Sequence, residues 1–169
     1  MHMVATLIIG VFVVVAALCD LRTRTIPREL TLFGLGFGLL LHCFIGGLLS
    51  AFVASLIGFA AGLTLFHIGA IGGGDVKLVT ALGALLGLPQ WILAMQIAIL
   101  AAAAMAIVQV TRMRVFRRTC RNVIEILKSL YISGFKAHPV INVNDLSAVR
   151  SPFGVAAAIG TMMVMVVRK

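Results

Sequence analysis

The sequence has little charge. Charged residues make up 11% of its 169 residues, whereas 62% are hydrophobic, and the mean hydropathy is +1.15. Soluble domains contain about 25% charged and about 45–50% apolar residues, and one small core cannot hide this much apolar surface from water. These proportions exclude a soluble enzyme, a disordered tail and a coiled coil. We therefore expect a protein embedded in a membrane.

Acidic residues and cysteines are also scarce. Five Asp and Glu stand against 14 Lys and Arg, which gives a net charge of +9. In a membrane protein such an excess is typical of cytoplasmic loops that face anionic lipid, and nucleic acid is only the second interpretation. The three cysteines lie far apart without a C-x-x-C pair, and the four histidines are equally scattered. This spacing argues against a zinc site, a redox motif or a disulfide framework, so we expect no metal and no cofactor.

The apolar residues form six runs. A hydrocarbon core of about 30 Å needs about 20 apolar residues per helix. The six runs therefore predict an all-α, polytopic helical bundle that forms a single domain, residues 1–169. The fourth run, closed by Pro89, is too short to span unless the glycine-rich turn before it lies at membrane depth, buried in protein or facing water. The first run could be a signal peptide; we interpret it as a retained span, because no Lys or Arg precedes it. The predicted segments are residues 3–19, 30–49, 51–71, 76–88, 91–110 and 153–167.

Basic residues are confined to alternate connections between these segments. The connections around Gly46-Gly47 and Pro89-Gln90 carry no Lys or Arg. By the positive-inside rule the basic loops are cytoplasmic and the N-terminus is outside. The basic residues are Arg22, Arg24 and Arg28 after the first segment, Lys77 after the third, and seven Lys or Arg between positions 112 and 136 after the fifth.

The long loop, residues 111–150, has a pattern of its own. Apolar residues recur at helical spacing between Val123 and Tyr131, next to a cluster of arginines. We predict an amphipathic helix lying on the inner leaflet. A nucleic-acid-binding arm is the alternative, but no aromatic stacking platform accompanies the charges.

Glycine pairs at G-x-x-x-G spacing occur three times. Small residues at this spacing allow helix backbones to approach closely, so together they predict a tight bundle. By contrast, Gly46 lies in a turn remote from any candidate site, and we expect it to accept Ala. The pairs are Gly34/Gly38, Gly58/Gly62 and Gly83/Gly87.

Two of the five acidic residues are candidates for chemistry. Asp20 closes the first apolar run and Asp75 opens the fourth, and ionisable groups at membrane depth are costly enough to indicate function. The predicted topology places both at the cytoplasmic end. Two neighbouring carboxyls cannot both ionise, so one can act as a base on water while the other donates a proton to a carbonyl oxygen. The structural alternatives are pairing of Asp20 with Arg22 or Arg24, and a first-turn acid at Asp75.

Three glycines, Gly72, Gly73 and Gly74, precede Asp75. Without a β-carbon they permit φ > 0 and a close approach of backbone or substrate. The alternative is a mere hinge. A phosphate-binding loop would need G-x-x-x-x-G-K-[ST], which is absent.

The two aspartate motifs together resemble the type IV prepilin peptidases. Residues 72–75 match the G-x-G-D motif of intramembrane aspartic proteases, and Asp20-Leu21-Arg22-Thr23-Arg24-Thr25-Ile26-Pro27 is similar to the first aspartate motif of that family. Their order and spacing resemble the short TadV/CpaA branch that serves Flp-type pili. The resemblance covers roughly residues 1 to 110.

The resemblance implies that Asp20 and Asp75 are the catalytic pair, with Gly72 to Gly74, Arg22, Arg24 and Lys77 shaping the site. The substrate would be a prepilin, whose leader is cut on the cytoplasmic side of the bacterial inner membrane, before its hydrophobic segment. The partners would be prepilin and lipid, not nucleic acid. Arg28 stands where the family commonly has Asn, which affects substrate contacts. Larger relatives also N-methylate the product with an added cytoplasmic region; we expect cleavage without methylation.

Other functions are compatible with membrane aspartates. A proton-coupled transporter or channel subunit is the main alternative, although ion pathways rarely need three glycines before the acid. A preflagellin or presenilin-like peptidase would use the same chemistry. A structural helper of pilus assembly would tolerate loss of either carboxyl.

Overall fold

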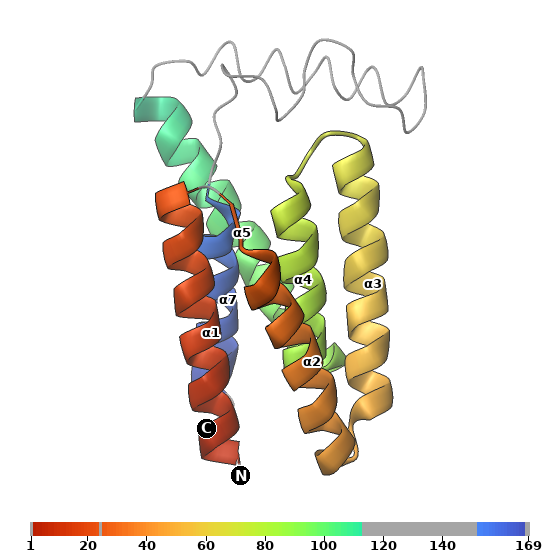
Figure 1. Ribbon diagram of the computed structural model, residues 1–169. Coiled ribbons are helices and arrows are strands. Elements are labelled where there is room, and N and C mark those ends of the chain that lie inside the picture. The colour runs from red at the N-terminus through yellow and green to blue at the C-terminus, as the bar shows by residue number, and fades with distance from the viewer. Residues whose placement is uncertain (1, 24, 113–151, 168–169) are drawn as a thin grey trace.

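The computed structural model describes residues 2–23, 25–112 and 152–167, and in these ranges it contains six helices and no strand. The prediction of an all-α membrane bundle is confirmed: four helices are long and apolar enough to cross a membrane, and α7 is a shorter apolar helix. The amphipathic helix expected in the long loop lies outside the described residues. The helices are α1 (His2–Thr23), α2 (Arg28–Ile45), α3 (Leu48–His67), α4 (Gly73–Leu86), α5 (Leu88–Arg112) and α7 (Phe153–Val167) (Figure 1).

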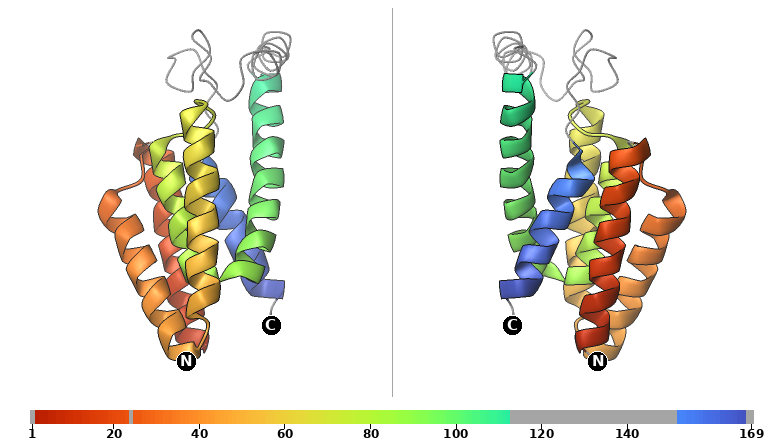
Figure 2. Two further views of the ribbon diagram at one scale, coloured as in Figure 1. Left: turned by 90° about the vertical axis from the view of Figure 1, so that its right-hand side faces the viewer. Right: turned by 90° about the vertical axis from the view of Figure 1, so that its left-hand side faces the viewer.

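The helices pack in two groups of three. Helix α4 packs against α2 and α3, while α7 packs against α1 and α5 and lies between them in Figure 2. Smaller contacts of α4 with α5 and α7 join the groups. Helix α4 is the short fourth segment of the sequence prediction, and most of its residues are buried. A helix too short to cross the bilayer is therefore shielded from lipid by its neighbours.

The interior contains many small residues, and many large apolar side chains point outward. The helix interfaces contain fully buried alanines, while Phe44, Leu49 and Leu100 are more than two thirds exposed. The exposed apolar side chains suit lipid, and the small residues allow the close backbone packing that stabilises helix pairs in a membrane. The fully buried alanines are Ala51, Ala54, Ala81, Ala84, Ala94, Ala98 and Ala156.

The glycine pairs mark several of these close contacts. A β-carbon at Gly38 would lie 2.5 Å from the carbonyl carbon of Ala84, and one at Gly83 would lie 2.7 Å from that of Ala54. Gly34, Gly58 and Gly62 are also buried against side chains of other helices. The prediction of a tight bundle from these pairs is confirmed. Gly87 differs, because it is not in a helix: it caps α4 with φ 71°.

The end of α4 and the role of Pro89 differ from the sequence prediction. Helix α4 ends at Leu86, before Gly87, and Pro89 lies in the first turn of α5. Proline is tolerated there because the first N–H groups of a helix have no intrahelical partner. The N–H of Leu88 instead donates to Oγ of Ser50 on α3, at 2.8 Å, which fixes the start of α5.

Gly46 does not match the expectation that it would accept Ala. Gly46 follows α2 in the left-handed conformation, with φ 76°. Residues other than glycine disfavour this conformation. The absence of any atom within 4 Å of a β-carbon there does not remove this backbone strain.

All the Lys and Arg of the described residues lie toward one end of the bundle. This end contains the last turns of α1, α3 and α5 and the first turns of α2, α4 and α7 (Figure 1). The opposite end contains the α2–α3 and α4–α5 turns, without a basic residue. The alternation read from the sequence therefore corresponds to two chemically different ends. The residues concerned are Arg22, Arg28, Lys77 and Arg112.

Candidate active site

Asp20 lies in the last turn of α1, where α1 meets α7. Its side chain is buried, with 7% of its surface exposed. Its Oδ2 accepts a hydrogen bond from the backbone N–H of Gly154, at 2.6 Å. A buried carboxyl without such a partner would be costly, so this contact accounts in part for its position.

Asp75 is the third residue of α4. Its Oδ2 accepts a hydrogen bond from the N–H of Gly72 at 3.1 Å, while its own N–H donates to the Gly72 carbonyl at 3.1 Å. An acid in the first turn also interacts favourably with the helix dipole. The first-turn position considered from the sequence is therefore correct. It does not exclude chemistry, because the side chain is only partly buried.

The glycines before Asp75 do not need positive φ, and that part of the sequence hypothesis is wrong. Gly72 is extended, with φ −81°, and none of residues 72–74 has positive φ. The left-handed residue of this connection is Gly69, with φ 75°. The N–H groups of Gly69 and Ala70 bond back to α3, in the pattern by which a glycine commonly ends a helix.

Another segment does pass next to Gly74, although the space there would admit a β-carbon. A β-carbon there would lie 3.4 Å from the backbone nitrogen of Ile26 and 3.6 Å from its Cβ. Ile26 is buried and follows α1. The segment after Asp20 therefore packs directly on the segment that contains Asp75.

This packing brings the two aspartates to one site. Asp20 and Asp75 lie at the same end of the bundle (Figure 1), where the contact between Ile26 and Gly74 joins the segment after Asp20 to the segment that contains Asp75. Oδ2 of each carboxyl accepts a hydrogen bond from a backbone N–H. Two such groups can share a proton, and a pair of this kind can provide both a general base and a general acid.

Two of the basic residues predicted to shape the site lie at the same end of the bundle as the aspartates. Arg22 and Lys77 are exposed at the end that contains both aspartates, whereas Arg24 lies outside the described residues. Glu29 is also exposed, at the start of α2.

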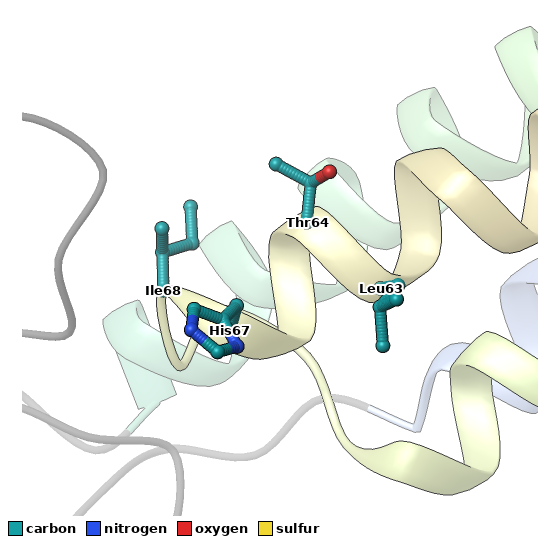
Figure 3. Close-up of a pocket in the computed structure, with 4 residues that line it drawn as sticks. All are labelled: Leu63, Thr64, His67 and Ile68. Atoms are coloured by element: carbon teal, nitrogen blue, oxygen red, sulfur yellow. The ribbon is translucent and has the colours of Figure 1, made fainter.

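A shallow hollow at the end of α3 is separate from the aspartates. Figure 3 shows its lining residues, Leu63, Thr64, His67 and Ile68, all from the last turns of α3 and the residue after it. Both Leu63 and His67 are exposed. The hollow is thus formed by one helix, and we assign it no part in the site.

The sequence reasoning missed Gly154. It lies 134 positions from Asp20, and the only local signal is a Pro-Phe-Gly start to the last apolar run. Such a start predicts where a helix begins but not which side chain its N–H groups meet.

The fold and the site define a class: a polytopic helical membrane protein with two carboxyls brought together at one end of the bundle. A model of the type IV leader peptidase family matches residues 7–107, more than half of the chain, and the chain belongs to that family. Both Asp20 and Asp75 fall within the matched part. The family indicates a peptidase with a prepilin-type substrate. No curated protein matches the chain. A search of solved structures likewise finds no match.

Proposed function

We propose that this protein is an aspartic endopeptidase of the bacterial inner membrane that removes the leader of Flp-type prepilins on the cytoplasmic side. The positions of Asp20 and Asp75 support the proposal most strongly, because the residues that match the two family motifs come from different helices and lie at the same end of the bundle, where Ile26 packs on Gly74. The similarity of residues 20–27 and 72–75 to the short TadV/CpaA branch supports the choice of substrate.

The proposed reaction needs only the two carboxyls and water. One carboxyl is ionised and takes a proton from water as the water oxygen attacks the scissile carbonyl carbon. The other carboxyl is protonated and donates to the carbonyl oxygen. In the gem-diol intermediate that results, one hydroxyl then returns its proton to the carboxyl that donated one, the carbonyl re-forms, the C–N bond breaks, and the leaving amine takes up the proton first removed from water. The backbone N–H groups of Gly154 and Gly72 orient the carboxyls for these transfers.

The surrounding residues have the proposed role of admitting the substrate. The N-cap residue Gly72 and the first two residues of α4, Gly73 and Gly74, present little bulk next to Asp75, so an extended peptide can pass close to the carboxyl. Arg22 and Lys77 lie at the basic end of the bundle, which by the positive-inside rule faces the cytoplasm, and in the sequence Arg24 belongs to the same basic connection as Arg22. A prepilin leader that stays in the cytoplasm reaches the site from this end.

The test is cleavage of a Flp-type prepilin by Asp20→Asn and Asp75→Asn variants. Each variant should lose about 10²-fold to 10⁴-fold or more in rate, because general acid–base catalysis contributes about that much. Glu29→Gln is the matched control, since Glu29 is an exposed acid at the same end and its variant should cleave normally. Normal cleavage by either Asn variant would refute the catalytic pair.

We further propose that the protein does not N-methylate the new N-terminus, and the mass of the processed pilin tests this. We expect a mature N-terminus without an added methyl group, even with a methyl donor supplied. A pilin heavier by one methyl group would show that this chain also methylates. If the protein cleaves no prepilin but transports protons across liposome membranes, the transporter alternative is favoured.

A further inference from the structure

The last helix contributes to the site although it lies outside the family-matched part of the chain. The match covers residues 7–107, whereas α7 is Phe153–Val167. Helix α7 packs along α1 and begins at the end where α1 finishes (Figures 1 and 2). The first turn of α7 is therefore placed against Asp20.

The start of α7 offers a donor that the helix itself does not use. The first N–H groups of any helix have no intrahelical acceptor, and Gly154 is the second residue of α7. Its N–H donates to Oδ2 of Asp20 at 2.6 Å. This hydrogen bond is shorter than the usual N–H···O distance of about 2.9 Å. The helix dipole also favours an acidic group at this end.

Only glycine fits at position 154 with Asp20 in its observed place. A β-carbon at Gly154 would lie 2.8 Å from Cβ of Asp20 and 2.9 Å from its Oδ2. Real β-carbons do not approach other atoms this closely. Alanine at this position would keep the N–H but would displace the carboxyl, or move α1 away from α7.

We propose that Gly154 is a positioning residue for Asp20, holding the carboxyl through its N–H and allowing this approach by its lack of a side chain. The inference rests on the proposed function, in which Asp20 is catalytic. It adds that the reactive geometry depends on α7. An error of about 1 Å in the placement of a catalytic group can cost about 10²-fold in rate.

The contact itself can be measured without an activity assay. We would label the full-length protein with ¹⁵N-glycine in detergent and follow the amide proton of Gly154. It should lie downfield in the wild type, move upfield in Asp20→Ala, and remain near its wild-type position in Asp20→Asn, whose side-chain oxygen still accepts. The amide of Gly36, exposed on α2, is the control and should not move. A Gly154 resonance indifferent to Asp20→Ala would overturn the inference.

The positioning role requires kinetics. Gly154→Ala should lower kcat for a prepilin by about 10-fold to 10²-fold and leave KM near the wild-type value, because the substrate does not need Gly154 to bind. Gly36→Ala, where nothing lies within 4 Å of the new β-carbon, should leave both constants unchanged. A folded Gly154→Ala variant with wild-type kcat would overturn the role.

Failure of the proposed function would give a different result. Asp20→Asn and Asp75→Asn would then cleave normally, while the Gly154 resonance would still respond to Asp20→Ala. That outcome would show that the contact exists but has no role in catalysis. If Gly154→Ala does not fold, the resonance measurement on the Asp20 variants still decides whether the contact exists.

Discussion

Gly74 packs on Ile26: a β-carbon at Gly74 would lie 3.4 Å from the Ile26 backbone nitrogen. This contact joins the segment after Asp20 to the first turn of α4, which contains Asp75. The two aspartates belong to different helix groups, so their relative position depends on contacts of this kind. Bulk at Gly74 would push the two segments apart.

A graded series at Gly74 tests this contact. An alanine β-carbon would be in ordinary van der Waals contact with Ile26 and should cost less than about threefold in cleavage rate, whereas valine adds two further methyl groups and should cost at least about tenfold. The measurement is prepilin cleavage by purified protein. Gly36→Val controls for placing a β-branched residue in a helix, because position 36 is exposed. Wild-type activity of Gly74→Val would mean that the glycines are only a flexible link.

Two glycines of α2 should respond to alanine with opposite signs. Gly38→Ala forces the α2 and α4 backbones apart and should destabilise the protein by about 1–3 kcal/mol, as overpacking does. Gly36→Ala meets nothing within 4 Å and should stabilise it by up to about 1 kcal/mol, because alanine favours helix. Unfolding by SDS titration of the detergent-solubilised protein measures both. Equal effects would contradict the packing of α2 on α4.

Replacing Ser50 by alanine should destabilise the protein more than replacing Ser55, which also lies on α3. Ser50→Ala leaves the Leu88 N–H at the start of α5 without its acceptor, and loss of such a cap costs about 0.5–2 kcal/mol. The hydroxyl of Ser55 only donates to the Ala51 carbonyl within its own helix, an interaction that adds little to helix stability. The same SDS titration should show a smaller loss for Ser55→Ala. The reverse order would contradict the assigned role of Ser50.

The orientation in the membrane is testable by cysteine labelling. In a background without the three natural cysteines, Thr25→Cys should resist an impermeant thiol reagent added to intact cells, and Gln90→Cys should react. Thr25 is exposed at the basic end and Gln90 lies in the first turn of α5 at the other. We expect this pattern because basic loops remain in the cytoplasm. The opposite pattern would place the aspartates outside and remove the proposed route for the leader.

The sequence by itself determined the class, the helices and the two candidate aspartates. Hydropathy and the scarcity of charge are properties of short stretches, so they could be read without any contact between distant residues. The distribution of basic residues likewise predicted which helix ends lie together. The motifs around Asp20 and Asp75 identified the family for the same reason, because each is contiguous.

Only the tertiary structure decided how these pieces meet. The positive φ considered for residues 72–74 occurs at Gly69 instead, because the end of α3, and not the start of α4, requires the left-handed turn. The tertiary structure placed Pro89 inside α5, because the Ser50 hydroxyl accepts the Leu88 N–H from across the bundle. The bond between Gly154 and Asp20 spans 134 positions. Such contacts arise from the packing of one helix on another, which the periodicity of either sequence segment does not specify.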